Sequence, residues 1–176
     1  MDCFQILRRK SEGLNAVDRH FILKLAETPG ELLAAQRLRY RVFVTELGAS
    51  GPTVDHQRQT ESDQFDSIYD HLLLIDRKRD PARLDHVVGV YRLLRGEVAA
   101  AGPGFYSAAE YDLDPILKSG RNLLELGRSC VDNDVRGGVG VYLLWNALAD
   151  YVQQYGIDVM FGVASYHGTD VAPIAQ

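Results

Sequence analysis

The spacing of apolar and polar positions along the chain predicts short strands that alternate with a few helices. Apolar runs bounded by turn residues predict strands over residues 20–27, 71–76, 86–94, 123–131 and 158–166. Helical spacing, with a weaker pattern after a Gly/Pro break, predicts helices over residues 29–48, 108–118 and 139–155. The polar connection 49–70 has no clear period, and a long irregular connection of this kind is often functional.

The order of these elements predicts an α/β (α+β) fold, a mixed sheet with helices on its faces. The runs HLLLID and HVVGVYRLL flank a polar segment with a proline, which indicates an antiparallel hairpin with a long turn. Residues 123–166 read as strand, helix and strand, so these strands should be parallel neighbours joined by a right-handed crossover. The nearly continuous apolar run at 158–166 predicts a strand covered on both faces.

Residue patterns within the helices predict their ends and their buried faces. Pro29 suits the first turn of the first helix, Glu31 suits the positive end of its dipole, and Gly48 is expected to end it. In the last helix, apolar residues at helical spacing predict a core stripe of Val141, Leu144, Trp145, Leu148, Val152 and Tyr155.

Composition fits one globular, soluble domain. The 176 residues are 46% hydrophobic and 24% charged, which is enough for a sizeable core. We interpret residues 1–19 as an amino-terminal extension and residues 20–176 as the domain. A net charge of -5 argues against nucleic acid as the main partner, so any basic contact surface must be local.

The number of cysteines and the lengths of the apolar runs indicate the cellular compartment. Two cysteines are too few for a disulfide framework, and no run approaches the length of a membrane span, so we expect a cytoplasmic protein. The amino terminus places Phe4, Ile6 and Leu7 beside three basic residues. It is either a frayed end or a peripheral contact with the inner face of the membrane.

A first candidate site joins the first helix to the polar connection. Arg39 should lie on or beside the inward face, four residues before Phe43. A buried guanidinium needs an acidic partner, since an unpaired buried charge is costly. The run TESDQFDS offers Glu61, Asp63 and Asp66, unless these are solvated loop acids.

The strongest candidate is the strand LLELGRSCV, because it places Glu125 inside an apolar run. Strict alternation would send Glu125 and Arg128 to opposite faces. Gly127 between them is a natural position for a bulge that re-aims one side chain. The structural alternative is that Glu125 pairs with Arg128 only to satisfy both charges.

Several other residues are candidates on weaker grounds. The residues Arg136, Gly137, Gly138 and Gly140 precede or open the last helix, where free amides bind phosphate. His167 follows the last strand, at the edge where α/β sites often form. Cys130 is expected in the core rather than as a nucleophile. The charged hairpin turn with Arg77, Lys78, Arg79 and Arg83 is either a solvated tip or a docking patch.

Together these residues resemble the acyl-carrier-protein-dependent branch of the GNAT-type acyltransferases, which includes acyl-homoserine-lactone synthases and the hemolysin-like ornithine N-acyltransferases. The matching positions are Arg39 with Phe43, Glu61-x-Asp63-x-x-Asp66, Arg92, and Glu125-x-x-Arg128. Wider phrases such as LAAQRLRYRVFVTELGA and FGVASYHGTD resemble the ornithine enzymes more closely. The tryptophan that lactone synthases carry after the Phe is absent from ELGAS, and the glycines of the 136–140 loop are out of step with the usual GNAT pattern.

This resemblance implies transfer of a 3-hydroxyacyl chain from acyl carrier protein to the α-amine of L-ornithine, giving lyso-ornithine lipid. It makes Glu125 and Arg128 the catalytic residues, with Glu125 as the base, and it implies a substrate pocket of Arg39, Phe43, Asp63, Asp66, Arg92 and His167. The 136–140 loop would hold the donor's phosphopantetheine. No metal or further cofactor is expected, and a coenzyme A thioester stays open as donor.

Three alternatives stay open beside this one. They are a lactone synthase using S-adenosylmethionine, an acetyl-coenzyme A N-acetyltransferase, and a catalytically inactive GNAT-like binding module. The final residues, GTDVAPIAQ, look like the opening of a helix capped by Thr169 or Asp170. Because the resembled family continues further, we expect the domain to be incomplete at its carboxyl end.

Overall fold

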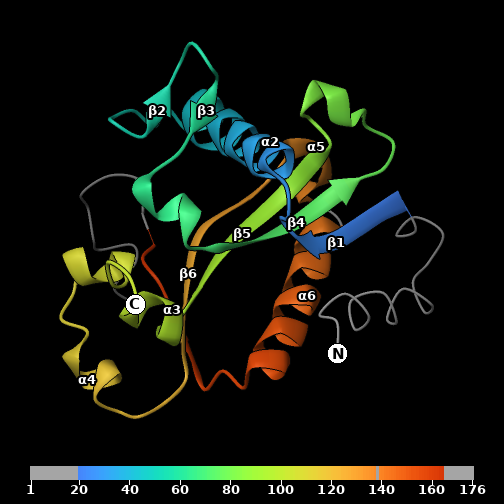
Figure 1. Ribbon diagram of the computed structural model, residues 1–176. Coiled ribbons are helices and arrows are strands. Elements are labelled where there is room, and N and C mark those ends of the chain that lie inside the picture. Colours follow the sequence, from blue (N-terminus) through green and yellow to red (C-terminus); the bar gives the residue numbers. More distant parts are fainter. Residues whose placement is uncertain (1–19, 138, 165–176) are drawn as a thin grey trace, which may run out of the picture.

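A five-stranded mixed sheet forms the centre of the computed structural model, which describes residues 20–137 and 139–164 (Figure 1). Its strands, in spatial order, are β1 (Phe21–Leu25), β4 (Asp70–Asp76), β5 (Val87–Arg95), β6 (Leu123–Val131) and β7 (Val159–Phe161). The first three pairings are antiparallel, and β6 pairs with β7 in parallel. The mixed sheet, the antiparallel hairpin and the parallel pair predicted from the sequence are therefore confirmed.

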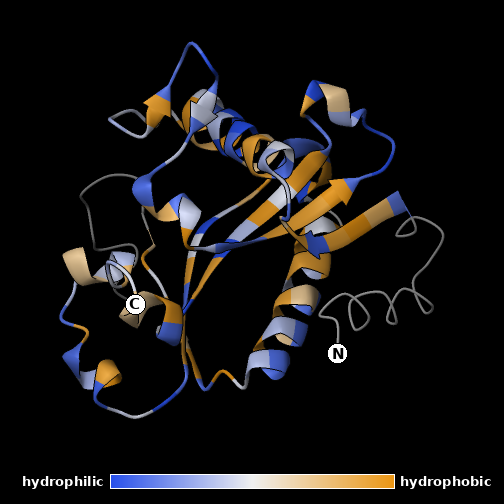
Figure 2. Ribbon diagram, in the orientation of Figure 1, coloured by the Kyte–Doolittle hydropathy of each residue, from blue (hydrophilic) through white to orange (hydrophobic). Residues whose placement is uncertain are grey.

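Two long helices cover opposite faces of this sheet. Helix α2 (Pro29–Arg39) packs on one face through a cluster that includes Leu38 and Val90, and α6 (Val139–Tyr155) packs on the other through Leu144 and Leu148. Side chains of β4 alternate between these two clusters, as the period of a strand requires. Figure 2 shows that the strands of the sheet are largely apolar and that both helices carry apolar and polar residues.

Smaller elements fill the connections. After α2 the chain continues as the π-helix η3 (Tyr40–Glu46) and then forms the two-stranded ribbon of β2 (Val54–Asp55) and β3 (Thr60–Glu61). The remaining short elements are η4 (Gln64–Ser67), η5 (Pro81–Arg83), α3 (Gly96–Ala100), η6 (Tyr106–Ala109), α4 (Asp114–Leu117) and α5 (Asn133–Arg136). The connection predicted as irregular thus contains β2, β3 and η4.

The first helix begins and ends near the predicted residues. Thr28 caps it, and Glu31 completes a capping box by accepting from the Thr28 amide. The chain leaves the helical segment at Gly48, whose φ of +74° suits glycine. Between these ends the helix changes from α to π after Arg39, a change that apolar spacing does not signal.

The buried stripe of the last helix differs from the predicted one. Trp145 is 48% exposed and Val141 is 39% exposed, whereas Leu143, Ala147 and Tyr151 are buried. The helix is rotated so that Gly140 faces the sheet, where a Cβ would lie 3.0 Å from the Val135 carbonyl oxygen. Trp145 instead meets the edge of Tyr91 near the surface.

Two other expectations were wrong. Residues 108–118 do not form one helix but belong to η6, a bend and α4, because Asp112 caps a separate turn through the Asp114 amide. The strand predicted over 158–166 pairs only as Val159–Phe161, and Met160 is 44% exposed. Met160 lies in the middle of this short strand, so the described part of the strand is not covered on both faces.

Candidate active site

Arg39 forms the centre of a buried ionic network on the α2 side of the sheet. Its side chain is fully buried, and its two terminal nitrogens donate to Asp66 Oδ1 and Oδ2 at 2.8 and 2.7 Å. Its Nε also lies 2.7 Å from Glu61 Oε2. The inward position of Arg39 and the acidic partners from the polar connection are both confirmed, and the alternative of solvated loop acids is wrong for Glu61 and Asp66, which are buried.

Two further arginines from the central strands extend the network. Arg92 on β5 is 1% exposed and donates to Asp63 Oδ1 at 2.6 Å and to Asp66 Oδ1 at 2.8 Å. Arg128 on β6 donates to Glu61 Oε1 at 3.1 Å and to Asp63 Oδ2 at 3.4 Å. Three arginines and three acids are therefore matched, which is what buried charges require.

A bulge in β6 makes this arrangement possible. The register between β5 and β6 shifts between Val90 and Arg92, so two residues of β6 stand opposite Tyr91. The predicted bulge is thus present, but Arg128 rather than Gly127 takes the left-handed conformation, with φ +48°. This backbone turns Arg128 toward Glu61 and Asp63 and away from the ordinary alternation of a strand.

Glu125 lies beside the network but has other partners. It is 1% exposed, and it accepts hydrogen bonds from the Tyr69 hydroxyl, from the Tyr106 amide at 2.9 Å and from the Ser107 amide at 2.6 Å. These partners overturn the alternative in which Glu125 merely pairs with Arg128. An ionised carboxylate offers about four lone-pair sites, and three are occupied here, so one site on Oε1 is left.

Aromatic rings connect Glu125 to the arginines. The Arg92 guanidinium lies 4.6 Å from the centroid of the Tyr69 ring, and that of Arg128 lies 5.4 Å from the centroid of Tyr106. The same two tyrosines donate to Glu125, through a hydroxyl and an amide. Tyr69, Tyr106 and Ser107 were not predicted, because nothing in the sequence links them to a glutamate many positions later.

Electrostatics keep Asp66 and Arg92 charged and Tyr69 neutral. Burial would raise the pKa of Asp66, but hydrogen bonds and charge from Arg39 and Arg92 hold it well below its usual range. Burial would lower the pKa of Arg92, yet Asp63 and Asp66 raise it. Burial and the hydrogen bond to Glu125 raise the pKa of Tyr69, so its hydroxyl stays a donor.

Regular pairing of the two parallel strands ends next to Glu125. Pairing of β6 with β7 ends at Glu125 opposite Phe161, while β6 continues to Val131. At the next residue of the second strand, Gly162, a Cβ would lie 2.3 Å from the Leu126 carbonyl oxygen. Only glycine fits there without a shift, so the two backbones approach closely at the point where the pairing stops.

Other predicted site residues lie outside this cluster. Phe43 packs against the apolar cluster under α2. The Arg136 guanidinium donates to Glu46 Oε2 at 2.6 Å and to the Val131 carbonyl oxygen. Gly137 follows α5 at the surface, and Gly140 packs α6 onto the sheet. Gly138, His167 and the extension 1–19 lie outside the described residues.

The remaining candidate nucleophile and one histidine are structural. Cys130 is buried in the cluster under α2, and burial raises the pKa of its thiol to about 12, so the expectation of a core residue is confirmed. His71 is 4% exposed, and its Nε2 lies 3.0 Å from the Asp66 carbonyl oxygen. Burial lowers the pKa of His71. The neutral imidazole therefore supports the backbone that carries Asp66.

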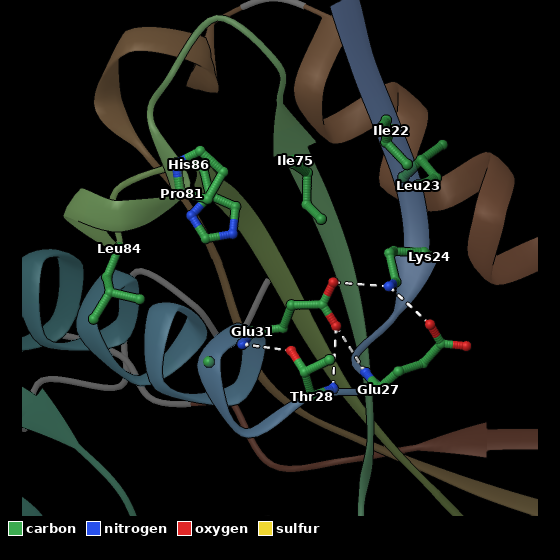
Figure 3. Close-up of a pocket in the computed structure, with 11 residues that line it drawn as sticks. Ile22, Leu23, Lys24, Glu27, Thr28, Glu31, Ile75, Pro81, Leu84 and His86 are labelled. Carbon is green, nitrogen blue, oxygen red and sulfur yellow. Dashed lines mark hydrogen bonds and ion pairs between the residues drawn. The ribbon is translucent and has the colours of Figure 1, made fainter.

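A separate cavity of about 700 Å³ lies at the opposite edge of the sheet, between β1, the start of α2 and the hairpin turn (Figure 3). Its walls are mainly apolar, with Ile22, Ile75 and Leu84 among them. Its charged groups are paired with one another, since Lys24 donates to Glu31 at 2.7 Å and to Glu27 at 2.9 Å. This cavity shares no residue with the ionic network.

The mixed sheet, the bulged β6 and the buried Glu125 at the end of its pairing with β7 are features of an acyltransferase-like architecture. Residues 38–146 match the family described as the acetyltransferase (GNAT) domain. The chain belongs to this family, as the resemblance predicted.

Particular relatives are similar over most of the chain. The L-ornithine N(alpha)-acyltransferase of Rhodobacter capsulatus is 56% identical over 154 residues, which cover 88% of this chain and 60% of that protein. The protein of the same name from Brucella abortus is 45% identical, with 83% and 53% covered. The chain spans between 50% and 60% of the length of the four relatives compared.

Solved structures share the fold at lower identity. The AHL synthase LasI has a TM-score of 0.55 at 21% identity, with 81% of this chain and 71% of that chain covered. FeeM, an N-acyl amino acid synthase from uncultured soil microbes, has a TM-score of 0.55 at 15% identity, with 80% and 68% covered. At these identities the likeness shows the fold. Among the described residues, no helix is long and apolar enough to cross a membrane.

Proposed function

We propose that the chain carries the catalytic site of an N-acyltransferase that moves a 3-hydroxyacyl group from acyl carrier protein to the α-amine of L-ornithine, giving lyso-ornithine lipid. The observation that carries this proposal is Glu125, buried where the pairing of β6 with β7 ends, with one acceptor site left. The acceptor amine comes from the relatives, which are named for acylation of ornithine. We place the reaction in the cytoplasm.

The reaction needs a neutral amine. The free site on Glu125 Oε1 takes a proton from the ammonium group of ornithine, directly or through a water. The amine then attacks the thioester carbonyl, and backbone amides near the end of the β6–β7 pairing stabilise the tetrahedral oxyanion. Collapse breaks the C–S bond, and the amine's second proton returns to the departing thiolate to give the free thiol of the carrier.

The arginines have different parts in this scheme. Arg39 and Arg92 are positioning residues, since each is at most 1% exposed and pairs with Asp66. Arg128 is 22% exposed at its side chain, and its guanidinium is the one of the three that a substrate carboxylate can reach most easily. We therefore assign Arg128 to the carboxylate of the amino acid.

The acyl donor rests on fewer observations than the acceptor amine. Residues Gly137 and Gly140 flank the start of α6, where the phosphopantetheine phosphate would lie against backbone amides. Coenzyme A would serve through the same contacts. The lactone synthase, the acetyltransferase and the inactive binding module predict other products, or none.

Release of free thiol tests the proposal. The purified protein is mixed with 3-hydroxyacyl carrier protein and ornithine, and the thiol is followed with time. We expect release that depends on ornithine and falls about 100-fold or more in Glu125→Gln. Glu110→Gln, at an exposed glutamate, is the matched control and should keep full activity. Absent release, or full activity of Glu125→Gln, overturns the proposal.

A further inference from the structure

A second group of arginines faces a surface hollow on the outer side of α2. The hollow has a volume of about 280 Å³ and is lined by Arg37 and Tyr40, by Arg41 and Thr45 of η3, by Gln59, and by Arg83 of the hairpin turn. Arg37, Arg41 and Thr45 are four residues apart, so they share one face of the helical segment. Two elements distant in sequence therefore point three guanidinium groups at one place.

Charge in this hollow is only partly compensated. No acid is among the described residues that line it. Two of its arginines have acidic partners that are not among the lining residues: Asp132 lies 3.3 Å from Arg41, and Asp85 lies 3.6 Å from Arg83. Asp132 is shared with Arg79, and the side chain of Arg83 stays 75% exposed. For Arg37, the buried Nε has no hydrogen-bond partner among the described residues.

The hollow adjoins the loop that would hold the donor. Asp132, the partner of Arg41, caps α5, which leads directly into the start of α6. On the next turn of η3, Glu46 accepts from Arg136 at the end of α5. Through Arg41 with Asp132 and Glu46 with Arg136, η3 is thus tied to α5 and to the loop that follows it.

We propose that this basic hollow, formed by Arg37, Arg41 and Arg83, docks an acidic face of the acyl carrier protein. The inference rests on the proposed function, since a carrier protein must stand beside the phosphate of its own phosphopantetheine. A net charge of -5 gives the rest of the chain no general attraction for an acidic partner. A local basic surface next to the donor loop supplies attraction and orientation where the thioester enters.

The docking turn is also the hairpin tip whose role the sequence left open. Arg79 is committed to Asp132 and Asp134, at 3.0 and 2.9 Å, so it fixes the turn against α5 and is not a contact residue. Arg83 projects from the same turn and remains exposed. The hairpin tip therefore carries one arginine that holds the turn, Arg79, and one that contacts the partner, Arg83.

Binding of the carrier protein, measured by calorimetry without turnover, tests the docking surface. The variants are Arg37→Gln and Arg83→Gln, and the matched control is Arg121→Gln, at an exposed arginine before β6. We expect each docking variant to weaken binding of 3-hydroxyacyl carrier protein roughly tenfold, and the double variant more. Raising the salt from about 50 to about 300 mM should weaken carrier binding by the wild type more than by the double variant, because salt screens the attraction between surface charges.

Other outcomes overturn the docking surface. Binding that is equal in the wild type, both docking variants and Arg121→Gln would do so, as would wild-type protein that does not bind the carrier. If inorganic phosphate binds to the wild type but not to Arg37→Gln, while both bind the carrier equally, the hollow is a small-anion site instead. Salt-dependent carrier binding without thiol release would leave the docking surface standing and overturn the proposed reaction.

Discussion

Arg37 and Arg39 stand two residues apart on the same helix and belong to different regions of the molecule. Arg39 is completely buried, and its guanidinium meets Asp66 and Glu61. Arg37 faces the surface hollow with Arg41 and Arg83, where no acid is among the described lining residues. The inner region balances every arginine with a carboxylate, whereas the outer region leaves positive charge facing solvent.

This difference separates charges that hold the fold from charges that recognise a partner. A buried arginine is tolerated only with acids in good geometry, and removing one partner strands the others. A surface arginine contributes little to stability, because water solvates it in the unfolded and folded states alike. Substitutions in the two regions should therefore affect different measurements.

The largest effect is expected from Arg39→Gln. Loss of the guanidinium leaves Asp66 and Glu61 buried without their main partner, so the free energy of unfolding should fall by about 3–5 kcal/mol. Arg37→Gln should change it by less than about 0.5 kcal/mol. Urea unfolding measures the loss in free energy of unfolding for each variant. Equal losses would contradict the distinction between the two regions.

The second largest effect is expected from acid, which should lower the stability that the inner region contributes. The pKa of Asp66 is lowered in the folded protein, so Asp66 stabilises the fold above its unfolded pKa of about 4, and this stability is lost as pH falls toward the folded pKa. We expect the free energy of unfolding of the wild type to fall by about 2–3 kcal/mol more than that of Asp66→Asn between pH 6 and pH 2. Parallel pH profiles would contradict a charged Asp66.

A smaller effect is expected at Arg128, the partly exposed arginine of the inner region. Replacement by Ala or by Gly removes the same ion pairs to Glu61 and Asp63. Gly tolerates the φ of +48° better, so Arg128→Gly should be more stable than Arg128→Ala by about 1 kcal/mol. Urea unfolding compares the pair; an Ala variant as stable as the Gly variant would show that the bulge relaxes when the side chain is lost.

The smallest change in stability is expected at the hairpin tip. Arg83→Gln removes an exposed side chain with one long ion pair, so the free energy of unfolding should stay within about 0.5 kcal/mol of the wild-type value. Arg79→Gln should cost more, because Arg79 bridges the turn to Asp132 and Asp134. Thermal unfolding of the two variants side by side checks the order, and the reverse order would contradict the assigned roles.

Much of the sheet and part of the site follow from local sequence. Strand β6 and helix α6 match their predicted bounds, because apolar periodicity and glycine breaks act over short distances. The pairing of Arg39 with the acids of TESDQFDS followed from the cost of a buried charge. The prediction placed Trp145 in the core because apolar residues lie on several sides of α6, and only packing decides which of them face the sheet.

What the sequence could not reveal depends on distant segments. Glu125 meets Tyr69 and the amides of Tyr106 and Ser107, which reach it only after β4, β5 and β6 have paired. The hollow joins α2 with the hairpin turn for the same reason. The left-handed residue of the bulge is Arg128 and not its glycine neighbour, since its ion pairs to Glu61 and Asp63 compensate for the backbone conformation.

Mass spectrometry of the product tests the central claim most directly. The purified protein is given a mixture of 3-hydroxyacyl carrier proteins and amino acids, and all acylated amines are identified. We predict ornithine carrying a 3-hydroxyacyl group on its α-nitrogen, formed by the wild type and lost in Glu125→Gln. An acyl-homoserine lactone, acylation of another amine in preference to ornithine, or no acylated product would contradict it.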